Sequence, residues 1–206
     1  YKIFISGYGF DMIKSKSNKL INPFKSLSLD SDKKYILLFG VLRKDKGIIE
    51  VIENFNKINT EYYLLIAGSE WDLKETQIND LIKKNNIEKR VIKHIKYIKE
   101  ENIEYYYNVS EIILIPHKNG FYSFSGPLAL AAKYKKHVLS SDLGEIGYFT
   151  NRYGLGKTFK VENWQDFTFQ LNNLISDIDK SNMKLNNNFY TQYTWENIVN
   201  RILKNL

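Results

Sequence analysis

Short runs of consecutive apolar residues alternate along this chain with longer segments in which apolar residues recur every three or four positions. A run without polar alternation is typical of a strand that is buried on both faces. Gly40, Gly68 and Pro116 directly follow three of the runs, and residues of this kind end strands. The sequence therefore predicts about six strands, at Tyr35–Phe39, Tyr62–Ala67, Val91–Ile95, Ile112–Ile115, Val138–Ser141 and, as a weaker pattern, Lys157–Lys160.

The segments between these runs carry the apolar spacing of amphipathic helices. The pattern extends over Ile48–Ile58, Leu73–Ile82, Glu100–Asn108, Leu128–Lys133 and Trp164–Ile178. Strands that alternate with helices through short connections form a parallel sheet with helices on both faces. We therefore predict an α/β fold in which residues 31–180 form one doubly wound, Rossmann-like domain of about six strands.

Two flanking segments fall outside this alternation. Residues 1–30 hold one strand-like piece, Ile3–Ser6, and a polar linker. Residues 181–206 pass from a run of asparagines into a last helix, which Thr194 can cap. Its apolar stripe consists of Trp195, Ile198, Val199, Ile202, Leu203 and Leu206. We expect this stripe to be buried, either against its own domain or against a partner domain.

Composition excludes several classes of protein. The 206 residues contain no Cys and three scattered His, which excludes a disulfide scaffold, a thiolate metal site and a zinc centre with the usual spacing. No apolar run approaches the roughly 20 residues that span a bilayer. The net charge is +7, from 30 Lys and Arg against 23 Asp and Glu. This charge attracts anions, and it does not choose among nucleotide phosphates, nucleic acid and an acidic membrane surface.

The loop Gly40–Gly47 carries the first candidate chemistry. In an open parallel sheet, ligands bind beyond the carboxyl ends of the strands. Arg43 and Lys46 lie there, between a strand end and a helix start whose free N–H groups favour anions. A bidentate guanidinium and a point-charge ammonium suit a diphosphate. A solvated basic turn is the alternative interpretation.

A second loop, at Ser125-Gly126-Pro127, precedes another predicted helix. We expect Pro127 at the first helical position, with Gly126 as its cap and Ser125 just outside. Small residues at a helix start let a phosphate approach free N–H groups and a hydroxyl, although ordinary capping needs the same residues. Both loops follow buried strands at the same sheet edge. We therefore predict a phosphate clamp, with Arg43 and Lys46 on one side and Ser125-Gly126 on the other.

Other residues with suitable chemistry have weaker patterns around them. Asp30 and Asp32 form a D-x-D sequence, but it precedes the first strand and is interpreted as linker. His117 follows a predicted strand end, where a structural role and a sugar contact are both open. We expect an ordinary turn or a donor-sugar contact at Gly144–Gly147. His94 and the run Tyr105–Tyr107 are expected to be structural, and His137 is expected to be a surface loop residue.

Several segments, taken in order, resemble the C-terminal half of GT-B glycosyltransferases of the glycosyl transferases group 1 set, often called family 4. They are FGVLRKDKG (Phe39–Gly47), LLIAG (Leu64–Gly68), Tyr97–Lys118, Ser125–Asp142 and YGLGK (Tyr153–Lys157). The resemblance implies the donor-binding domain of a retaining, metal-independent glycosyltransferase of the hexosyltransferase type. Such an enzyme moves sugar from a UDP- or GDP-type donor to a glycan or lipid-linked acceptor in polysaccharide or glycoconjugate biosynthesis, with no bound cofactor.

The resemblance also assigns roles to individual residues. Arg43 and Lys46 would hold the diphosphate and neutralise the charge that develops on the leaving group. Main-chain groups of Tyr97-Ile98 would edge the base. The expected donor-contacting positions are Gly40, Arg43, Lys46, Tyr97, Ile98, Ser125, Gly126 and Pro127. No metal site is expected.

This sequence departs from the family pattern at three positions. Tyr122 and Leu130 stand where the family commonly has two glutamates, and Val41 stands at its first basic position. Ribose binding and the identity of the base are therefore open. A degenerate, non-catalytic nucleotide- or partner-binding module is the alternative interpretation. Nucleic-acid binding would rest on charge alone, and we do not expect it.

The resemblance further implies an N-terminal GT-B domain as a partner. Ile3–Asp11 resembles the last strand and turn of that domain, and residues 181–206 resemble the helix that crosses back to it. We expect this chain to bind donor but to transfer sugar poorly or not at all by itself. The implied location is cytoplasmic, and the positive charge adds the hypothesis of peripheral contact with an anionic membrane.

Overall fold

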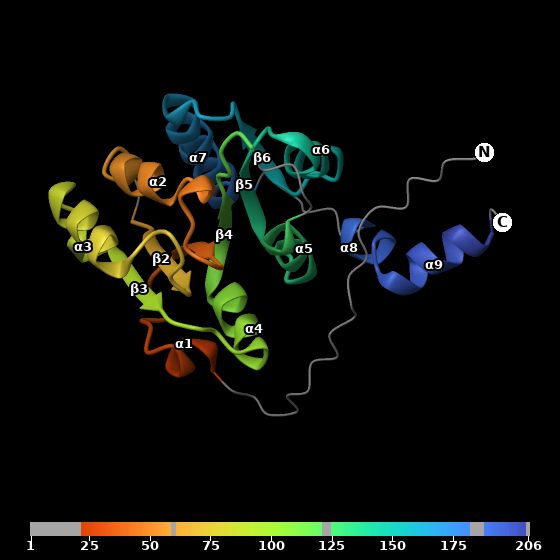
Figure 1. The fold of residues 1–206 in the computed structure, drawn as a ribbon, viewed down its shortest axis with the longest axis horizontal. Helices are drawn as coiled ribbons and strands as arrows, with labels where there is room; N and C mark the ends of the chain where they lie inside the picture. The colour runs from red at the N-terminus through yellow and green to blue at the C-terminus, as the bar shows by residue number, and fades with distance from the viewer. Residues whose placement is uncertain (1–21, 59–60, 121–124, 182–187, 205–206) are drawn as a thin grey trace.

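The computed structural model describes residues 22–58, 61–120, 125–181 and 188–204. Six strands within these ranges form one parallel sheet in the order β3-β2-β1-β4-β5-β6 (Figure 1). The strands are β1 (Tyr35–Phe39), β2 (Tyr63–Gly68), β3 (Val91–Ile95), β4 (Ser110–Ile115), β5 (His137–Ser141) and β6 (Gly156–Phe159). The order reverses between β1 and β4, as in doubly wound nucleotide-binding folds. The predicted fold class is confirmed.

Helices cover both faces of the sheet. Figure 1 shows α2 (Ile48–Phe55), α3 (Glu75–Lys84) and α7 (Trp164–Asp179) on one side. The other side carries α4 (Glu100–Val109), α5 (Gly126–Lys133) and α6 (Gly144–Arg152), with the short α1 (Pro23–Ser26) beside α4. Two 3-10 turns complete the domain, η1 (Lys44–Lys46) and η2 (Glu88–Arg90).

The apolar runs produce two cores, one on each face of the sheet. Successive side chains of a strand point to opposite faces. Accordingly, Ile36 and Leu38 of β1 join the cluster under α2, α3 and α7, whereas Tyr35 and Leu37 join the cluster under α4, α5 and α6. All four side chains are buried. This double burial explains why β1 is apolar at every position.

The loops at the carboxyl ends of β1 and β4 pack tightly against each other. Gly47, the N-cap residue of α2, has a φ of 65°, and a Cβ placed on it would lie 2.2 Å from the carbonyl oxygen of Pro116. A side chain cannot fit there, so glycine permits both the backbone conformation and the contact. This contact fixes the Arg43–Lys46 loop next to the end of β4.

Three α-helices were absent from the sequence prediction: α1, α6 and the short α8 (Asn188–Gln192), which begins in the asparagine run before the predicted last helix. Pro23–Ser26 forms α1 inside the segment interpreted as linker, and its N-cap is the Asn22 side chain. Gly144–Gly147, expected as a turn, is the first turn of α6, so the turn interpretation is wrong. Two glycines hide the helical pattern there. Gly147 is required because a Cβ would lie 2.4 Å from the backbone of Asp142.

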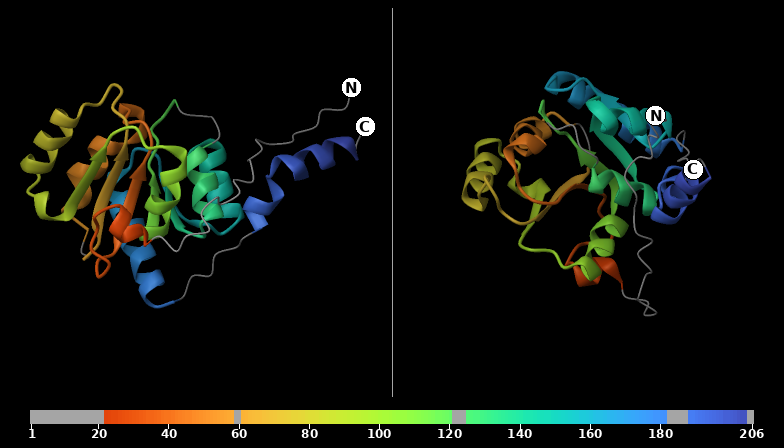
Figure 2. Two further views of the ribbon diagram at one scale, coloured as in Figure 1. Left: turned by 90° about the horizontal axis from the view of Figure 1, so that it is seen from below. Right: turned by 45° about the vertical axis from the view of Figure 1, so that its right-hand side comes forward.

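The end of the described chain forms α8 (Asn188–Gln192) and α9 (Trp195–Leu203). In Figure 2, α9 extends away from the sheet and its covering helices. Ile198 alone of the predicted stripe is buried, whereas Trp195, Val199 and Leu203 are exposed, and Leu206 lies outside the described residues. The stripe therefore packs only in small part on this domain. No helix in the described ranges is long and apolar enough to cross a membrane.

The predicted division of the chain into three segments, residues 1–30, 31–180 and 181–206, stays a prediction. The strand-like piece at Ile3–Ser6 and its continuation to Asp11 lie outside the described residues. Asp30 accepts a hydrogen bond from the Asp32 N–H at 3.0 Å, in a turn that leads into β1. This contact agrees with the linker interpretation of the D-x-D sequence.

Candidate functional site

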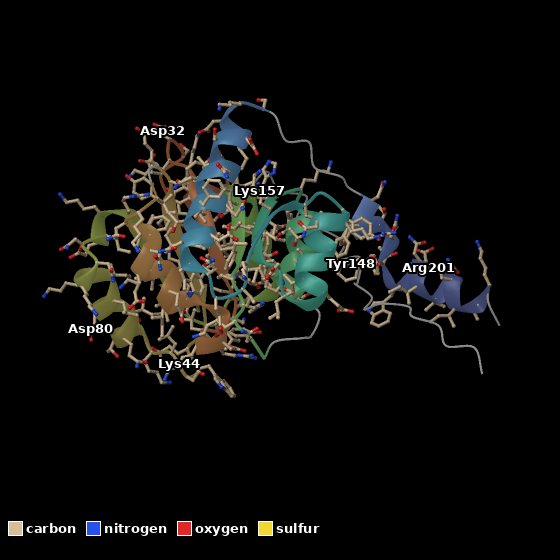
Figure 3. All side chains as sticks on the ribbon, turned by 90° about the horizontal axis from the view of Figure 1, so that it is seen from above. Asp32, Lys44, Asp80, Tyr148, Lys157 and Arg201 are labelled. Carbon is tan, nitrogen blue, oxygen red and sulfur yellow. The ribbon has the colours of Figure 1, made fainter. Side chains whose placement is uncertain are left out.

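The loop after β1 is held by hydrogen bonds to two neighbouring loops. The Leu42 N–H donates to the Ser69 carbonyl at 2.7 Å, and the Lys44 N–H donates to Asp72 Oδ1 at 2.9 Å. On the other side, the Lys118 N–H donates to the Asp45 carbonyl at 2.8 Å. The backbone that carries Arg43 and Lys46 is therefore fixed at the carboxyl edge of the sheet. In Figure 3, Lys44 marks this edge, opposite Asp32 and Lys157 at the amino edge.

A small cavity brings the two predicted loops together. Lys46 from the first loop and Pro127 from the second line it, with Gly40 at the end of β1 and His117 beyond β4. About 20 Å³ is open to the centre of a water molecule, which is room for about one water. Of the predicted donor-contacting residues, the structure thus gathers Gly40, Lys46 and Pro127 around one cavity. Arg43 and Ser125 are not among the residues that line it.

Lys46 is a largely buried cation in this cavity. Burial lowers the pKa of its ammonium group, and the nearby Arg43 charge lowers it further. Its Nζ lies 3.0 Å from where a Cβ on Gly40 would be, so the side chain passes directly over that glycine. Among the described residues, no hydrogen-bond or salt-bridge partner is found for this ammonium. The arrangement is suited to an anion that binds to this ammonium at the mouth of the carboxyl-edge loops.

Arg43 is placed differently from the prediction, because it is already paired. Its Nε donates to Asp45 Oδ1 at 2.9 Å, and its Nη2 forms a second bond to Asp45 Oδ2. The guanidinium lowers the pKa of the Asp45 carboxyl group below its usual range. Sequence reasoning missed Asp45 as part of the site. The signal available was the opposite charge two residues away in the same loop.

His117 contributes a buried imidazole next to Lys46. Its side chain is 4% exposed. Burial, followed by the positive charge of Lys46, lowers the pKa of His117 to about 4. The imidazole is therefore neutral at pH 7. The sugar contact considered for this residue stays a prediction.

The start of α5 carries a buried hydroxyl for which the described part of the chain supplies no partner. Ser125 is the N-cap residue and Pro127 lies in the first turn, one position further into the helix than expected. The Ser125 hydroxyl is buried, makes no capping bond, and has no hydrogen-bond partner among the described residues. A buried hydroxyl without a partner is unfavourable. An anion or a hydroxyl at this helix start would satisfy it, together with the first free N–H of the helix.

The positions predicted to edge the base lie beyond β3, which is two strands from β1 in the sheet. Tyr97 is 78% exposed, whereas Ile98 is partly buried against the core cluster under α4 and α5. Leu130, at one of the family's glutamate positions, packs against the same cluster. Tyr122, at the other position, lies outside the described residues. The structure does not bring Tyr97 or Ile98 to the cavity at Lys46.

The remaining candidates have structural surroundings. His94 Nδ1 lies 3.1 Å from the Tyr106 hydroxyl, and the two rings meet edge to face. Tyr106 and Tyr107 are buried in the core, as predicted for the tyrosine run. His137, expected in a surface loop, is the first residue of β5 and is half-buried, because the strand begins one residue earlier than predicted and pairs there with Ile112 of β4. The surface-loop prediction is therefore wrong. No group of three or more His, Asp or Glu in the described ranges could hold a metal ion.

The fold is that of the C-terminal domain of GT-B glycosyltransferases. Sucrose-phosphate synthase from Thermosynechococcus elongatus has a TM-score of 0.74 and 18% identity, covering 97% of this chain and 48% of its own. Anabaena HepE in complex with UDP and glucose has a TM-score of 0.73 and 15% sequence identity, and the match covers 96% of this chain and 55% of the HepE chain. The C-terminal domain of a glycosyl transferase group 1 family protein, LpcC, from Francisella tularensis has a TM-score of 0.63 and 17% sequence identity. This match covers 90% of this chain and 94% of the LpcC domain.

The chain belongs to the family glycosyl transferases group 1, whose model matches residues 22–192. Its resemblance to this family, stated from the sequence, is confirmed. The comparison with curated proteins found no match. The chain spans about half the length of the sucrose-phosphate synthase and HepE chains.

Proposed function

We propose that this chain is the donor-binding domain of a glycosyltransferase. A nucleotide diphosphate sugar of the UDP or GDP type would bind at the carboxyl edge of the sheet. Its diphosphate would lie between Arg43 and Lys46 on one side and the Ser125-Gly126 helix start on the other. The family supports glycosyl transfer, and a structural neighbour, HepE, is described in complex with UDP and glucose.

One observation carries this proposal: unsatisfied polar groups come from both loops. The Lys46 ammonium lies in the cavity without a partner among the described residues, and the Ser125 hydroxyl is buried without one at the start of α5. Pro127 of the same helix start lines the cavity with Lys46. A diphosphate has enough acceptor oxygens to bind both groups at once.

The arrangement suggests how the residues would assist the reaction. Departure of a nucleoside diphosphate leaves negative charge on its phosphates. Arg43 and Lys46 would stabilise that charge, together with the N–H groups at the start of α5. His117, neutral and buried beside Lys46, would add no charge of its own. We propose that this electrostatic stabilisation takes the place of a metal, and that transfer is of the retaining, hexosyl type.

The acceptor site and further catalytic groups are proposed to lie in an N-terminal domain that is outside this chain. The exposed stripe of α9, at Trp195, Val199 and Leu203, is proposed to contact that domain, as in a crossover helix. The chain by itself would then bind donor but transfer sugar poorly. A glycan or lipid-linked acceptor, a role in polysaccharide biosynthesis, and a cytoplasmic location with peripheral membrane contact are proposed from the family resemblance.

Calorimetric titration with UDP, GDP and ADP tests the proposal. We expect at least one diphosphate to bind, and Lys46→Ala to weaken its binding by about 10-fold to 100-fold, because a charge-assisted contact is lost. Lys44→Ala is the matched control. It removes the same charge from the same loop, but Lys44 is exposed and does not line the cavity.

Two outcomes would contradict the proposal. One is the absence of binding by any of the three diphosphates. The other is an equal loss of affinity in Lys46→Ala and Lys44→Ala, which would mean that the diphosphate is attracted by the positive surface in general and not by a specific site.

A degenerate module that binds nucleotide or a partner without catalysis is the second candidate. The observation that favours it is Leu130, which packs against the core where the family commonly carries a glutamate. A leucine cannot accept a hydrogen bond from ribose. Leu130→Glu should tighten diphosphate nucleotide binding if the donor site is otherwise intact. No gain in affinity would favour the non-catalytic module.

A further inference from the structure

The carboxylate of Asp45 is hydrogen-bonded to the guanidinium of Arg43. In the proposed function, this same guanidinium binds the diphosphate. The Arg43 Nε and Nη2 each bond one Asp45 oxygen. These are the two parallel donors with which arginine binds phosphate. We propose that Asp45 is a built-in competitor of the diphosphate, and that donor binding exchanges the Arg43–Asp45 ion pair for an Arg43–phosphate contact. This inference rests on the proposed function.

The backbone around the pair is held, so the exchange needs only side-chain rotation. The Lys46 N–H donates to the Arg43 carbonyl at 3.1 Å, and the Lys118 N–H donates to the Asp45 carbonyl at 2.8 Å. Asp72 binds the Lys44 N–H at 2.9 Å. None of these bonds uses the Asp45 carboxylate. It can leave Arg43 while the loop stays in place.

Because the Arg43–Asp45 ion pair is partly exposed to solvent, the exchange of its carboxylate for a phosphate has a low energetic cost. The side chains of Arg43 and Asp45 are 39% and 34% exposed. An ion pair in contact with water contributes little to stability, because both partners can be hydrated and the attraction is screened. A released Asp45 carboxylate can turn into solvent. A fully buried carboxylate would instead be trapped with its partner.

The local charges give Asp45 opposite effects in the free and bound states. Without ligand, its negative charge offsets the repulsion between Arg43 and Lys46, two cations that lie close enough to influence each other. With a diphosphate bound, the same carboxylate becomes a like charge beside the phosphates. Removing it should therefore favour the complex and disfavour the free protein.

Asp45→Asn tests this inference, because it removes the charge and keeps the size of the side chain. We expect the affinity for the diphosphate nucleotide that binds the wild-type chain, and for inorganic pyrophosphate, to rise by about threefold to tenfold. Uridine, which has no phosphate, should show no change. Asp72→Asn is the matched control. Its carboxylate lies on the adjacent loop but is not bonded to Arg43, and a smaller gain is expected.

Combination with Arg43→Ala identifies the contact responsible. If Asp45 competes for Arg43, most of the gain from Asp45→Asn should disappear in the Arg43→Ala background, and only the smaller gain from removing a like charge beside the phosphates should remain. Unchanged or weaker binding in Asp45→Asn alone would overturn the inference and would make Asp45 a residue that positions Arg43. If neither the wild type nor Asp45→Asn binds any diphosphate, both the inference and the proposed function are overturned. The two failures are therefore distinguishable.

Discussion

His117 is a titratable group that the folded chain keeps neutral. Its folded pKa of about 4 lies below the ordinary value of 6.5. The unfolded state therefore binds a proton more readily than the folded state. The contribution of His117 to stability is complete above pH 6.5 and is lost as the pH falls from 6.5 toward 4.

We predict that the wild-type chain loses more stability between pH 7.5 and pH 5 than His117→Gln does. The expected difference is about 2 kcal/mol, because the protonation of His117 favours the unfolded wild-type chain at pH 5 and is absent from the variant, whereas the other histidines contribute equally to both proteins. Urea unfolding at the two pH values measures it. Equal losses in the two proteins would show that burial of this imidazole does not control acid stability.

The sequence alone suggested Lys46 and Ser125 as candidate site residues, because each lies in a loop between a buried strand and a helix. It did not identify the pairing of Arg43 with Asp45. Whether a cation in a loop faces solvent, a ligand or a neighbouring carboxylate depends on side-chain rotamers, which composition and spacing do not determine. The burial of His117 was equally hidden, since it arises from packing between loops that are distant in the sequence.

At the scale of elements, the contact between the β1 loop and the end of β4 depends on a glycine. Gly47 has a φ of 65°, and a Cβ would meet the Pro116 carbonyl and the Trp164 ring. Gly154 has a similar φ of 58°, but no atom lies within 4 Å of the position that a Cβ would take there. The two residues share the backbone conformation and differ in the space around them.

Gly47→Ala should therefore destabilise the chain by about 3 kcal/mol, whereas Gly154→Ala should cost only about 1 kcal/mol for the left-handed backbone. The Gly47 variant should also weaken nucleotide binding, because the steric conflict displaces the loop that carries Lys46. Urea unfolding and calorimetry measure the two effects. Equal destabilisation by the two variants would mean that the Pro116 contact adds nothing.

The central strands β1, β2 and β4 were predictable because their apolar runs are buried on both faces of the sheet. The edge strand β6 (Gly156–Phe159) has only a weak pattern, because three of its four residues are only partly buried. The helix α6 was not predictable in this way, because a segment with two glycines, Gly144 and Gly147, has the composition of a turn. Gly147 is there for close approach to Asp142, a tertiary requirement that local propensity does not record. The short α1 was missed for the related reason that four residues show no periodicity.

At the scale of the molecule, α8 packs into the core of the domain, whereas α9 contacts the core along only one side. Phe189 of α8 is fully buried and its ring lies 5.0 Å from that of Tyr153 and 5.2 Å from that of Phe149, measured between centroids. Val199 and Leu203 of α9 face solvent. The core therefore includes α8 and only the Ile198 side of α9.

Phe189→Ala should lower the free energy of unfolding by about 3 kcal/mol, because it leaves a cavity among aromatic rings. Val199→Ala should change it by less than about 0.5 kcal/mol, as at an exposed position. Urea unfolding of the chain measures both. A large loss from Val199→Ala would show that the α9 stripe packs on this domain after all, against its proposed contact with another.

The position of β1 in the sheet has a consequence for synthesis of the chain. One edge of β1 pairs with β2, which follows it closely, but the other edge pairs with β4, which begins only at Ser110. While the ribosome is translating α3, β3 and α4, that second edge has no partner, and unpaired apolar strands recruit other chains. A nascent polypeptide arrested before Ser110 is thus an aggregation-prone species, in need of a chaperone until β4 emerges.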